Sequence, residues 1–263
     1  MPLPPVHYAE KVKIAVSGKG GTGKTTIAAT LARLIARRGR RVLAIDCDSN
    51  PNLATSLGLD DRVAQKMRPM PKRALDDGTS VSDLIAEYAV DAPDGVELVL
   101  AARVEEAGAG CTCGSHATVR GLLAEIVSRE ADVTVVDMEA GLEHLSRSGG
   151  TLRYVDHLMI VVEPYVKSTQ TAYRTLALAR DLGIPRISVL GSKVRDETEL
   201  TTIRKVCADT GLQLIGVIPY DESVRVADRD GKSPVDAVPE SSMVRAVDDL
   251  AGALLETRTS LSA

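Results

Sequence analysis

The residues of this chain best suited to chemistry lie together at positions 18–26. Gly18, Gly23, Lys24 and Thr25 satisfy the pattern G-x-x-x-x-G-K-[ST] of a phosphate-binding loop. Glycines let the backbone turn so that several N–H groups aim at phosphate oxygens, Lys24 adds a point charge, and the Thr25 hydroxyl is placed to ligate Mg²⁺. A glycine-rich turn that merely joins a strand to a helix is the plainer alternative. The residues expected to bind a nucleoside triphosphate here are Gly18, Gly20, Gly21, Thr22, Gly23, Lys24, Thr25 and Thr26.

The segments on either side of the loop are those that a phosphate site requires. Residues 12–16 are mostly apolar and predict a short buried strand before the loop, and residues 26–38 predict a helix after it. The N-terminus of such a helix adds the positive end of its dipole to the phosphate site. Strand, loop and helix together favour nucleotide binding over a simple turn.

Acidic side chains follow two further apolar runs. Residues 41–45 predict a strand that leads into Asp46 and Asp48, and residues 133–136 predict a strand that ends at Asp137. Ligands of parallel sheets bind outside the carboxyl ends of the strands, so we expect these carboxylates beside the phosphate loop. Asp137 is suited to hold a water molecule of a triphosphate-bound Mg²⁺. Asp46 and Asp48 could instead cap the turn that follows them.

A second feature with chemical potential is the pair Cys111 and Cys113. Side chains two residues apart in an extended segment lie on the same side, so both thiols would face one way. Two thiolates cannot complete a four-coordinate site for a soft divalent metal, whereas a two-fold dimer brings four together. Two ordinary or redox-active thiols are the alternative. We expect His116 and His144 to be packed or solvated, and Cys47 to be a small packed apolar group.

Strands and helices alternate along the rest of the chain. We therefore predict one doubly wound α/β domain over residues 12–257, with a mostly parallel sheet of seven or eight strands and helices on both faces. Residues 1–11 are predicted to be a flexible tail, residues 258–263 a second tail, and the polar residues 60–79 an exposed excursion. The other expected strands are 96–101, 157–163, 187–191 and 214–218, and the other expected helices are 80–88, 118–129, 168–182, 197–210 and 244–255.

Composition narrows the classes of protein further. Of the 263 residues, 44% are hydrophobic but only 2% aromatic, without Phe or Trp, so the core must be built from aliphatic residues, as in a sheet covered on both faces. The net charge of −4 argues against nucleic-acid binding through a basic surface. No apolar run suits a membrane span and no signal peptide is recognised, so we expect a cytoplasmic protein whose four cysteines are reduced thiols.

The run Lys-Gly-Gly-Thr-Gly-Lys-Thr-Thr at 19–26 resembles the deviant phosphate loop of the MinD/ParA group of dimeric ATPases. The resemblance implies that Lys19 reaches across a two-fold interface to the nucleotide of the partner subunit, where a cation stabilises the transferring phosphoryl group. A solvated surface lysine is the alternative. The segment after the second strand resembles the first switch of that group, which implies that Asp48 orients the attacking water and Asp46 supports it. Gly141 would be the pivot of a second switch near the terminal phosphate. The implied catalytic residues are Lys19, Lys24 and Asp48.

The loop, Cys111-Thr112-Cys113, and the strings at 137–144 (Asp-Met-Glu-Ala-Gly-Leu-Glu-His) and 218–222 (Ile-Pro-Tyr-Asp-Glu) together resemble the CooC family. These are nickel-inserting ATPases that mature carbon monoxide dehydrogenase, and the resemblance covers nearly the whole chain. It implies a cytosolic ATPase of slow intrinsic turnover that forms a homodimer on ATP or metal binding. Such a dimer would hold Ni²⁺, or Zn²⁺ in the same site, between its Cys pairs and couple hydrolysis to metal delivery to a client metalloenzyme.

The base of the nucleotide is contacted in that group by an Asn-Lys pair at the end of a late strand and by a Pro-containing loop. Here the pair is Ser192-Lys193, and a hydroxyl can still hydrogen-bond a base edge, which leaves the preference between adenine and guanine open. Pro219, Tyr220 and Asp221 are expected to form the other wall.

Two other classes of function stay open. A MinD/ParA-like spatial organiser would use the same ATP-gated dimer to bind a membrane or DNA. Residues 244–250 are mixed in charge, however, and suit packing on the sheet better than membrane binding. A regulatory relative would use the nucleotide only as a conformational ligand, although the motif residues are intact. We therefore expect neither a membrane nor a nucleic acid as partner.

Overall fold

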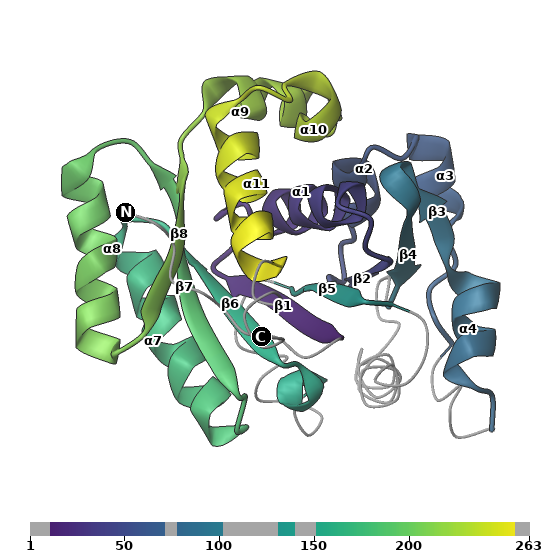
Figure 1. The fold of residues 1–263 in the computed structure, drawn as a ribbon, viewed down its shortest axis with the longest axis horizontal. Helices are drawn as coiled ribbons and strands as arrows, with labels where there is room; N and C mark the ends of the chain where they lie inside the picture. Colours follow the sequence, from purple (N-terminus) through teal and green to yellow (C-terminus); the bar gives the residue numbers. More distant parts are fainter. Residues whose placement is uncertain (1–10, 72–77, 102–130, 140–150, 256–263) are drawn as a thin grey trace, which may run out of the picture.

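The central element of the fold is a parallel sheet with β1 in its middle (Figure 1). A computed structural model describes residues 11–71, 78–101, 131–139 and 151–255. Within them the sheet has eight strands in the order β3-β4-β2-β5-β1-β6-β7-β8, and only the edge pair of β3 and β4 is antiparallel. The strands are β1 Val12–Gly18, β2 Val42–Asp46, β3 Val90–Ala92, β4 Val96–Leu100, β5 Val133–Asp137, β6 His157–Val162, β7 Arg186–Val194 and β8 Gln213–Pro219.

The central strands form because they are mostly apolar and lie between two layers of helices. Every residue of β1, β2, β5 and β6 is buried. Helices α1, α2 and α11 pack with one face of the sheet, and α4, α7 and α8 pack with the other (Figure 1). The helices are α1 Lys24–Arg37, α2 Leu53–Leu57, α3 Asp61–Lys66, α4 Val81–Tyr88, α7 Val166–Asp181, α8 Glu197–Thr210, α9 Glu222–Arg229, α10 Pro234–Ala237 and α11 Ser242–Leu255, with 3₁₀ turns η2 Pro93–Gly95 and η4 Thr151–Tyr154.

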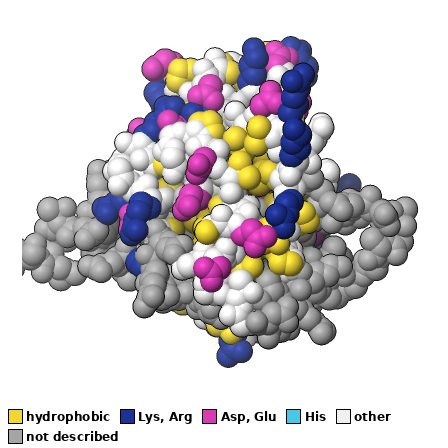
Figure 2. Space-filling model, turned by 90° about the vertical axis from the view of Figure 1, so that its right-hand side faces the viewer, with side chains coloured by type: hydrophobic (Ala, Val, Ile, Leu, Met, Phe, Trp, Pro, Cys, Tyr) yellow, Lys and Arg dark blue, Asp and Glu magenta, His cyan; other side chains and the backbone are white. Residues whose placement is uncertain are grey.

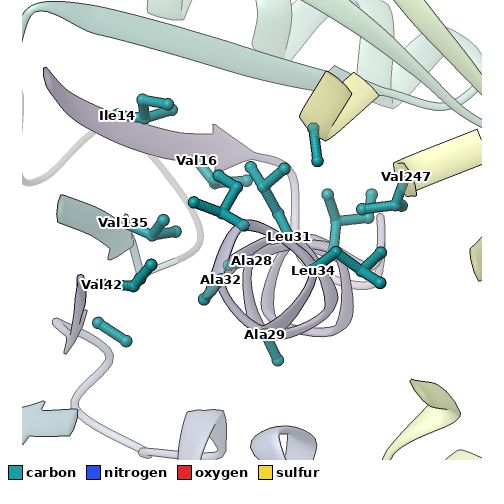
Figure 3. Packing of buried hydrophobic residues seen from close by; sticks show 14 of the residues in the cluster. Ile14, Val16, Ala28, Ala29, Leu31, Ala32, Leu34, Val42, Val135 and Val247 are labelled. Carbon is teal, nitrogen blue, oxygen red and sulfur yellow. The ribbon is translucent and has the colours of Figure 1, made fainter. Parts of the chain in front are cut away.

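Helix α1 is the most enclosed helix around the site, because it packs against both the sheet and α11. Its side chains Leu31 and Leu34 lie between Val16 of β1 and Val247 of α11 (Figure 3). Burial of aliphatic side chains on this scale stabilises by about 1.5–3 kcal/mol for each fully buried residue. The helix that begins at the phosphate loop is therefore held firmly in place.

A buried arginine ties α1 to three distant segments. Arg33 is only 2% exposed, and its guanidinium donates to Asp94 of η2 (2.6 Å) and to both carboxylate oxygens of Asp236 in α10 (2.5 and 2.8 Å). It also donates to the Leu57 carbonyl at the end of α2 and to the Ser233 hydroxyl, each at 3.2 Å. Because the planar fork matches a carboxylate, this geometry fixes α10 and η2 on the outer side of α1.

The predicted architecture is confirmed, but several local expectations are not. The α/β class, the eight-stranded sheet and the packing of the last helix on it agree with the structure. The exposed excursion at 60–79 is wrong in part, because α3 forms there and the apolar side chains of Met67 and Met70 are buried (5% and 3% exposed). Strand β3 and helices α9 and α10 were not predicted. The predicted helix 118–129 and the tails, apart from Lys11, lie outside the described residues.

The molecular surface on the side of α3 and α4 is mixed in charge. Figure 2 shows Lys and Arg side chains interspersed there with Asp and Glu, with small hydrophobic areas between them. Among the described residues, no helix has the length and apolarity needed to cross a membrane.

Candidate nucleotide site

The phosphate loop leaves β1 at a position that only glycine can occupy. Gly18 pairs with Val161 of the neighbouring strand β6 and has a φ of +154°. A Cβ atom at this position would lie 2.5 Å from the Val161 carbonyl oxygen. Since real Cβ atoms do not approach backbone oxygen so closely, a side chain here would force β1 and β6 apart. The first glycine of the motif is thus required for close strand packing.

The loop closes on itself before α1 begins. The Lys19 carbonyl accepts hydrogen bonds from the Thr22 hydroxyl (2.9 Å), the Thr22 N–H (3.3 Å) and the Lys24 ammonium (3.4 Å). Gly23 then takes the left-handed conformation (φ +86°) as the N-cap of α1, without a side-chain cap for the first helical N–H groups. These N–H groups and the helix dipole are suited to bind an anion.

Lys24 lies deep in the site and faces two carboxylates. Its side chain is 6% exposed, and burial lowers the pKa of its ammonium, while the charges of Asp137 and Asp48 raise it. The Lys19 side chain, by contrast, is half-buried. Lys24 is therefore positioned to bind phosphate within the subunit.

Thr25 and Asp137 fit a Mg²⁺ ion bound with a triphosphate. Burial raises the pKa of the Asp137 carboxyl group and the Thr25 side chain lowers it, and Asp137 Oδ1 is buried without a hydrogen-bond partner among the described residues. A buried carboxylate oxygen with no partner is costly, and a cation or its water ligand would satisfy it. Hydroxyl and carboxylate oxygens are also the ligands that Mg²⁺ prefers. The two residues are thus a suitable donor set for this ion.

Asp46 and Asp137 end neighbouring strands and lie opposite each other in the β2–β5 register. Burial raises the pKa of both carboxyl groups well above the usual range, and the charge of Asp46 raises that of Asp137 further. Asp46 accepts backbone N–H groups of Asp48 (3.0 Å) and Leu53 (2.9 Å). It thereby shapes the turn that carries the half-buried Asp48, whose carboxylate accepts the Asn50 N–H (2.8 Å). The capping alternative holds for both residues, and it does not exclude a second role for Asp48.

The two segments that follow β2 and β5 are joined by a side-chain bond. The Ser49 hydroxyl donates to Glu139 Oε1 at 2.6 Å. Ser49 follows Asp48, and Glu139 lies two residues after Asp137, so the bond connects the predicted first switch to the start of the second. Motif reasoning missed this pair, because nothing in the sequence relates two polar residues that are ninety positions apart.

A pocket of about 330 Å³ adjoins the phosphate loop and has the size and lining of a site for a nucleoside. Its floor includes the buried apolar side chains of Ile218 and Met243 (2% and 4% exposed). Its rim is polar. The lining residues are Gly21, Gly23, Lys24, Thr25, Thr26, Ile27, Ser192, Lys193, Ile218, Pro219, Tyr220, Asp221, Val224, Arg225, Asp228 and Met243.

The two residues expected to contact the base from β7 also hold the phosphate loop. Ser192 is buried and its hydroxyl donates to the Thr22 carbonyl (2.8 Å). The Lys193 ammonium donates to the Gly21 carbonyl and pairs with Glu163 at 3.0 Å. Lys193 also has a φ of +55°, a strained value that its contacts must stabilise. Both residues line the pocket, but their polar atoms serve the loop backbone.

Asp221 anchors the opposite wall. Its carboxylate accepts the N–H and hydroxyl of Ser223 (3.0 and 2.6 Å) and those of Ser242 (both 2.8 Å). These bonds lower the pKa of Asp221 to about 2. Asp221 thus caps α9 and joins it to the start of α11, so that the loop from Pro219 to Asp221 is held at the pocket edge.

The predicted metal-binding cysteines fall outside the part of the chain that the structure describes. The residues outside the described part are Cys111, Cys113, Gly141 and the two histidines His116 and His144. Among the described residues, no group of three or more His, Cys, Asp or Glu side chains is arranged to hold a metal ion.

Cys47 is a small packed residue, as predicted from its place after β2. It is 2% exposed, and burial, with Asp46 next to it, raises the pKa of its thiol well above the usual value. A thiol of this kind is chemically inert.

Comparison with known proteins agrees with this geometry. Residues 13–235 match the family described as the CobQ/CobB/MinD/ParA nucleotide binding domain. The carbon monoxide dehydrogenase accessory protein CooC of Rhodospirillum rubrum is 38% identical over 87% of this chain and 91% of its own length. An uncharacterized ATP-binding protein of Methanocaldococcus jannaschii is 36% identical over 81% of this chain and 87% of its own length. The septum site-determining protein MinD from Pyrococcus horikoshii, solved with Mg-ADP, has a TM-score of 0.70 at 22% identity over 92% of this chain and 94% of its own, a likeness of fold.

Proposed function

Because this chain belongs to the CobQ/CobB/MinD/ParA family of nucleotide-binding domains and is an ATPase, we propose that it couples ATP hydrolysis to the delivery of Ni²⁺ or Zn²⁺ to a client metalloenzyme. The observation that carries the proposal is the 38% identity to a carbon monoxide dehydrogenase accessory protein over most of both chains. A carbon monoxide dehydrogenase is accordingly the proposed client, and the cytoplasm the proposed compartment.

The phosphate site supplies the chemistry of hydrolysis. The loop N–H groups and the buried Lys24 bind the β- and γ-phosphates, and Thr25 and Asp137 hold the ion that accompanies them. A bound Mg²⁺ supplies charge neutralisation at the phosphate oxygens. Asp48, on the turn shaped by Asp46, orients the attacking water. Preorganised charges of this kind accelerate phosphoryl transfer chiefly by positioning and electrostatic stabilisation.

In the proposed mechanism, a homodimer completes both the ATPase site and the metal site. The half-buried Lys19 would reach the nucleotide bound by the partner subunit. The γ-phosphate would draw together the segments joined by the Ser49–Glu139 bond, and the second of these continues to Gly141. Cys111 and Cys113 precede β5 in the sequence, so movement at the end of that strand offers a route by which hydrolysis changes the separation of the two Cys pairs. Thiolate ligands are deprotonated, so metal affinity should weaken as pH falls.

The metal site is tested by metal analysis of the purified dimer. We expect one nickel or zinc ion per two subunits in the wild type and loss of that ion in Cys113→Ser. Cys207→Ser is the matched control, because Cys207 is a half-buried cysteine on α8, and it should retain the metal. Equal metal content in Cys113→Ser and wild type would remove the shared site and leave an ATP-gated switch.

The assignment of Asp48 is tested by steady-state hydrolysis of ATP. Asp48→Asn should lower kcat by at least about 100-fold, the contribution of a group that orients or activates the nucleophile. Asp91→Asn, on the exposed edge strand β3, is the control and should hydrolyse ATP at the wild-type rate. Lys24→Ala should also abolish turnover. Activity that survives in Asp48→Asn would rule out its proposed role without affecting that of the phosphate loop.

A further inference from the structure

One wall of the base pocket is supported from outside by an arginine that no motif singles out. We propose that Arg195, which lies between β7 and α8, is a positioning residue that holds Tyr220 in place for recognition of the nucleotide base. The proposal rests on nucleotide binding at the phosphate loop, as described above.

The guanidinium of Arg195 lies over the ring of Tyr220, with its Cζ atom 4.2 Å from the ring centroid. This is within the range of a cation–π contact. The Tyr220 N–H donates to the Val194 carbonyl at 3.0 Å, next to Arg195 in the chain. The backbone of Tyr220 is therefore attached to the last residue of β7, and its ring contacts the residue after it. Since Tyr220 lines the base pocket, Arg195 acts on the ligand through it.

Arg195 is itself fixed from two helices. One oxygen of Glu199 accepts the Arg195 N–H (2.7 Å) and the other lies 3.5 Å from its guanidinium. The guanidinium also donates to the Tyr165 hydroxyl at 3.0 Å, immediately before α7. Asp196 caps α8 by accepting the Glu199 N–H at 2.8 Å, so the carboxylate that holds Arg195 has a defined place. Arg195 thus connects the start of α7 and the first turn of α8 to the loop from Pro219 to Asp221.

The far end of the Tyr220 side chain is held as well. Its hydroxyl donates to Glu222 Oε2 at 2.5 Å, and Glu222 pairs with Arg225, another residue of the pocket lining. Arg225 and Tyr220 lower the pKa of Glu222 to about 2, so this carboxylate stays charged at neutral pH. A ring held at both ends loses little conformational freedom when a base binds, and that preorganisation favours binding.

Because Arg195 is partly exposed, we expect its substitution to change nucleotide binding more than folding stability. Its side chain is 47% exposed, so its ion pair and ring contact are screened by water and should contribute little to folding. Loss of these contacts should instead weaken the affinity for a ligand that carries a base. Phosphate binding should be unaffected, because the hydrogen bonds by which Ser192 and Lys193 hold the loop do not involve Arg195.

The experiment is calorimetric titration of the full-length protein with Mg-ATP and with Mg-tripolyphosphate, a ligand without base or ribose. In Arg195→Ala, the Kd for ATP should rise about three- to fivefold, the size of an exposed cation–π contact, while the Kd for tripolyphosphate is unchanged. The KM for ATP should rise with kcat unchanged. Arg195→Lys keeps a cation and should recover part of the loss. Arg204→Ala is the matched control, since Arg204 is an exposed arginine of α8 paired with Glu197, and it should bind both ligands as wild type does.

Two outcomes would overturn the proposal. One is an unchanged Kd for ATP in Arg195→Ala, and the other is an equal loss for ATP and tripolyphosphate, which would mean that the substitution disturbs the whole site. Tyr165→Phe removes a single hydrogen bond of Arg195, should weaken ATP binding in the same direction by less, and serves if Arg195→Ala does not fold. Failure of the wild type to bind either ligand would instead refute the nucleotide-binding function itself.

Discussion

Replacing Arg33 with methionine should destabilise this fold far more than replacing its neighbour Arg37. Methionine matches the apolar stem of Arg33 but leaves Asp236, the Leu57 carbonyl and the Ser233 hydroxyl without their arginine donor, and it removes one of the two arginines that hold Asp94. Arg37 also pairs with Asp94, at 3.1 Å, but its side chain is 42% exposed. The two variants remove the same charge from the same helix, one turn apart, in very different surroundings.

The expected cost follows from the burial of each partner. Breaking a fully buried pair costs about 3–5 kcal/mol, because an uncompensated charge remains. Here Asp94 is 20% and Asp236 51% exposed, so water recovers part of their solvation and we expect a loss of about 2–3 kcal/mol for Arg33→Met. For Arg37→Met we expect less than about 1 kcal/mol. Arg33→Lys should lose nearly as much as Arg33→Met, because an ammonium cannot form the two-pronged bond to Asp236.

Urea unfolding followed by circular dichroism measures these differences, with the midpoint and the slope fitted for each variant. For a chain of this length, the loss in Arg33→Met corresponds to a fall in Tm of about 5–10 °C. If Arg33→Met and Arg37→Met unfold at the same urea concentration, the buried network contributes nothing beyond an ordinary surface pair and the reasoning is refuted.

Three other predictions concern the loop, the core and the alternative function. Gly18→Ala should cost at least about 2 kcal/mol in unfolding free energy, because its methyl group would overlap the Val161 carbonyl. Gly39→Ala should cost about 1 kcal/mol, because Gly39 has a φ of +78° but no atom within 4 Å of the added Cβ. Thermal melts of both variants separate steric crowding from backbone strain. Burial lowers the pKa of His157 to about 3 against an ordinary 6.5, so the folded state keeps it neutral and stability should fall as pH drops from about 6.5 towards 3, by up to about 1.4 kcal/mol per pH unit. In His157→Gln that part of the slope should vanish, and an identical pH profile in urea titrations would show that this histidine is not the cause. Co-sedimentation with anionic liposomes or with DNA in the presence of ATP should recover no protein, and recovery in either pellet would favour a spatial organiser.

The sequence predicts the strands and the helix around the phosphate loop well because its signals are local. A glycine spacing, a lysine and a hydroxyl within nine positions define the loop, and the aliphatic runs before Asp46 and Asp137 define the strands that end beside it. The pattern of hydrophobic residues and the motif are enough to predict an element that is uniformly buried, as β1 and β5 are.

Features that depend on distant partners could not be predicted in this way. Arg33 resembles a surface arginine in the sequence, because the acids that hold it lie 61 and 203 positions away. The hydrogen bond from the Ser192 hydroxyl to the Thr22 carbonyl joins residues 170 positions apart and has no local signal in the sequence. Short elements such as β3 carry too few residues for a pattern, and buried methionines within polar residues 60–79 gave no periodic signal.

The absence of tryptophan from the sequence has a practical consequence. With no tryptophan and six tyrosines in 263 residues, the protein does not fluoresce at an excitation wavelength that is selective for indole. A single tryptophan put in place of Tyr220 would thus be its only such fluorophore, located at the wall of the base pocket. Its emission would follow nucleotide arrival and departure in real time, with no background from the rest of the molecule to subtract.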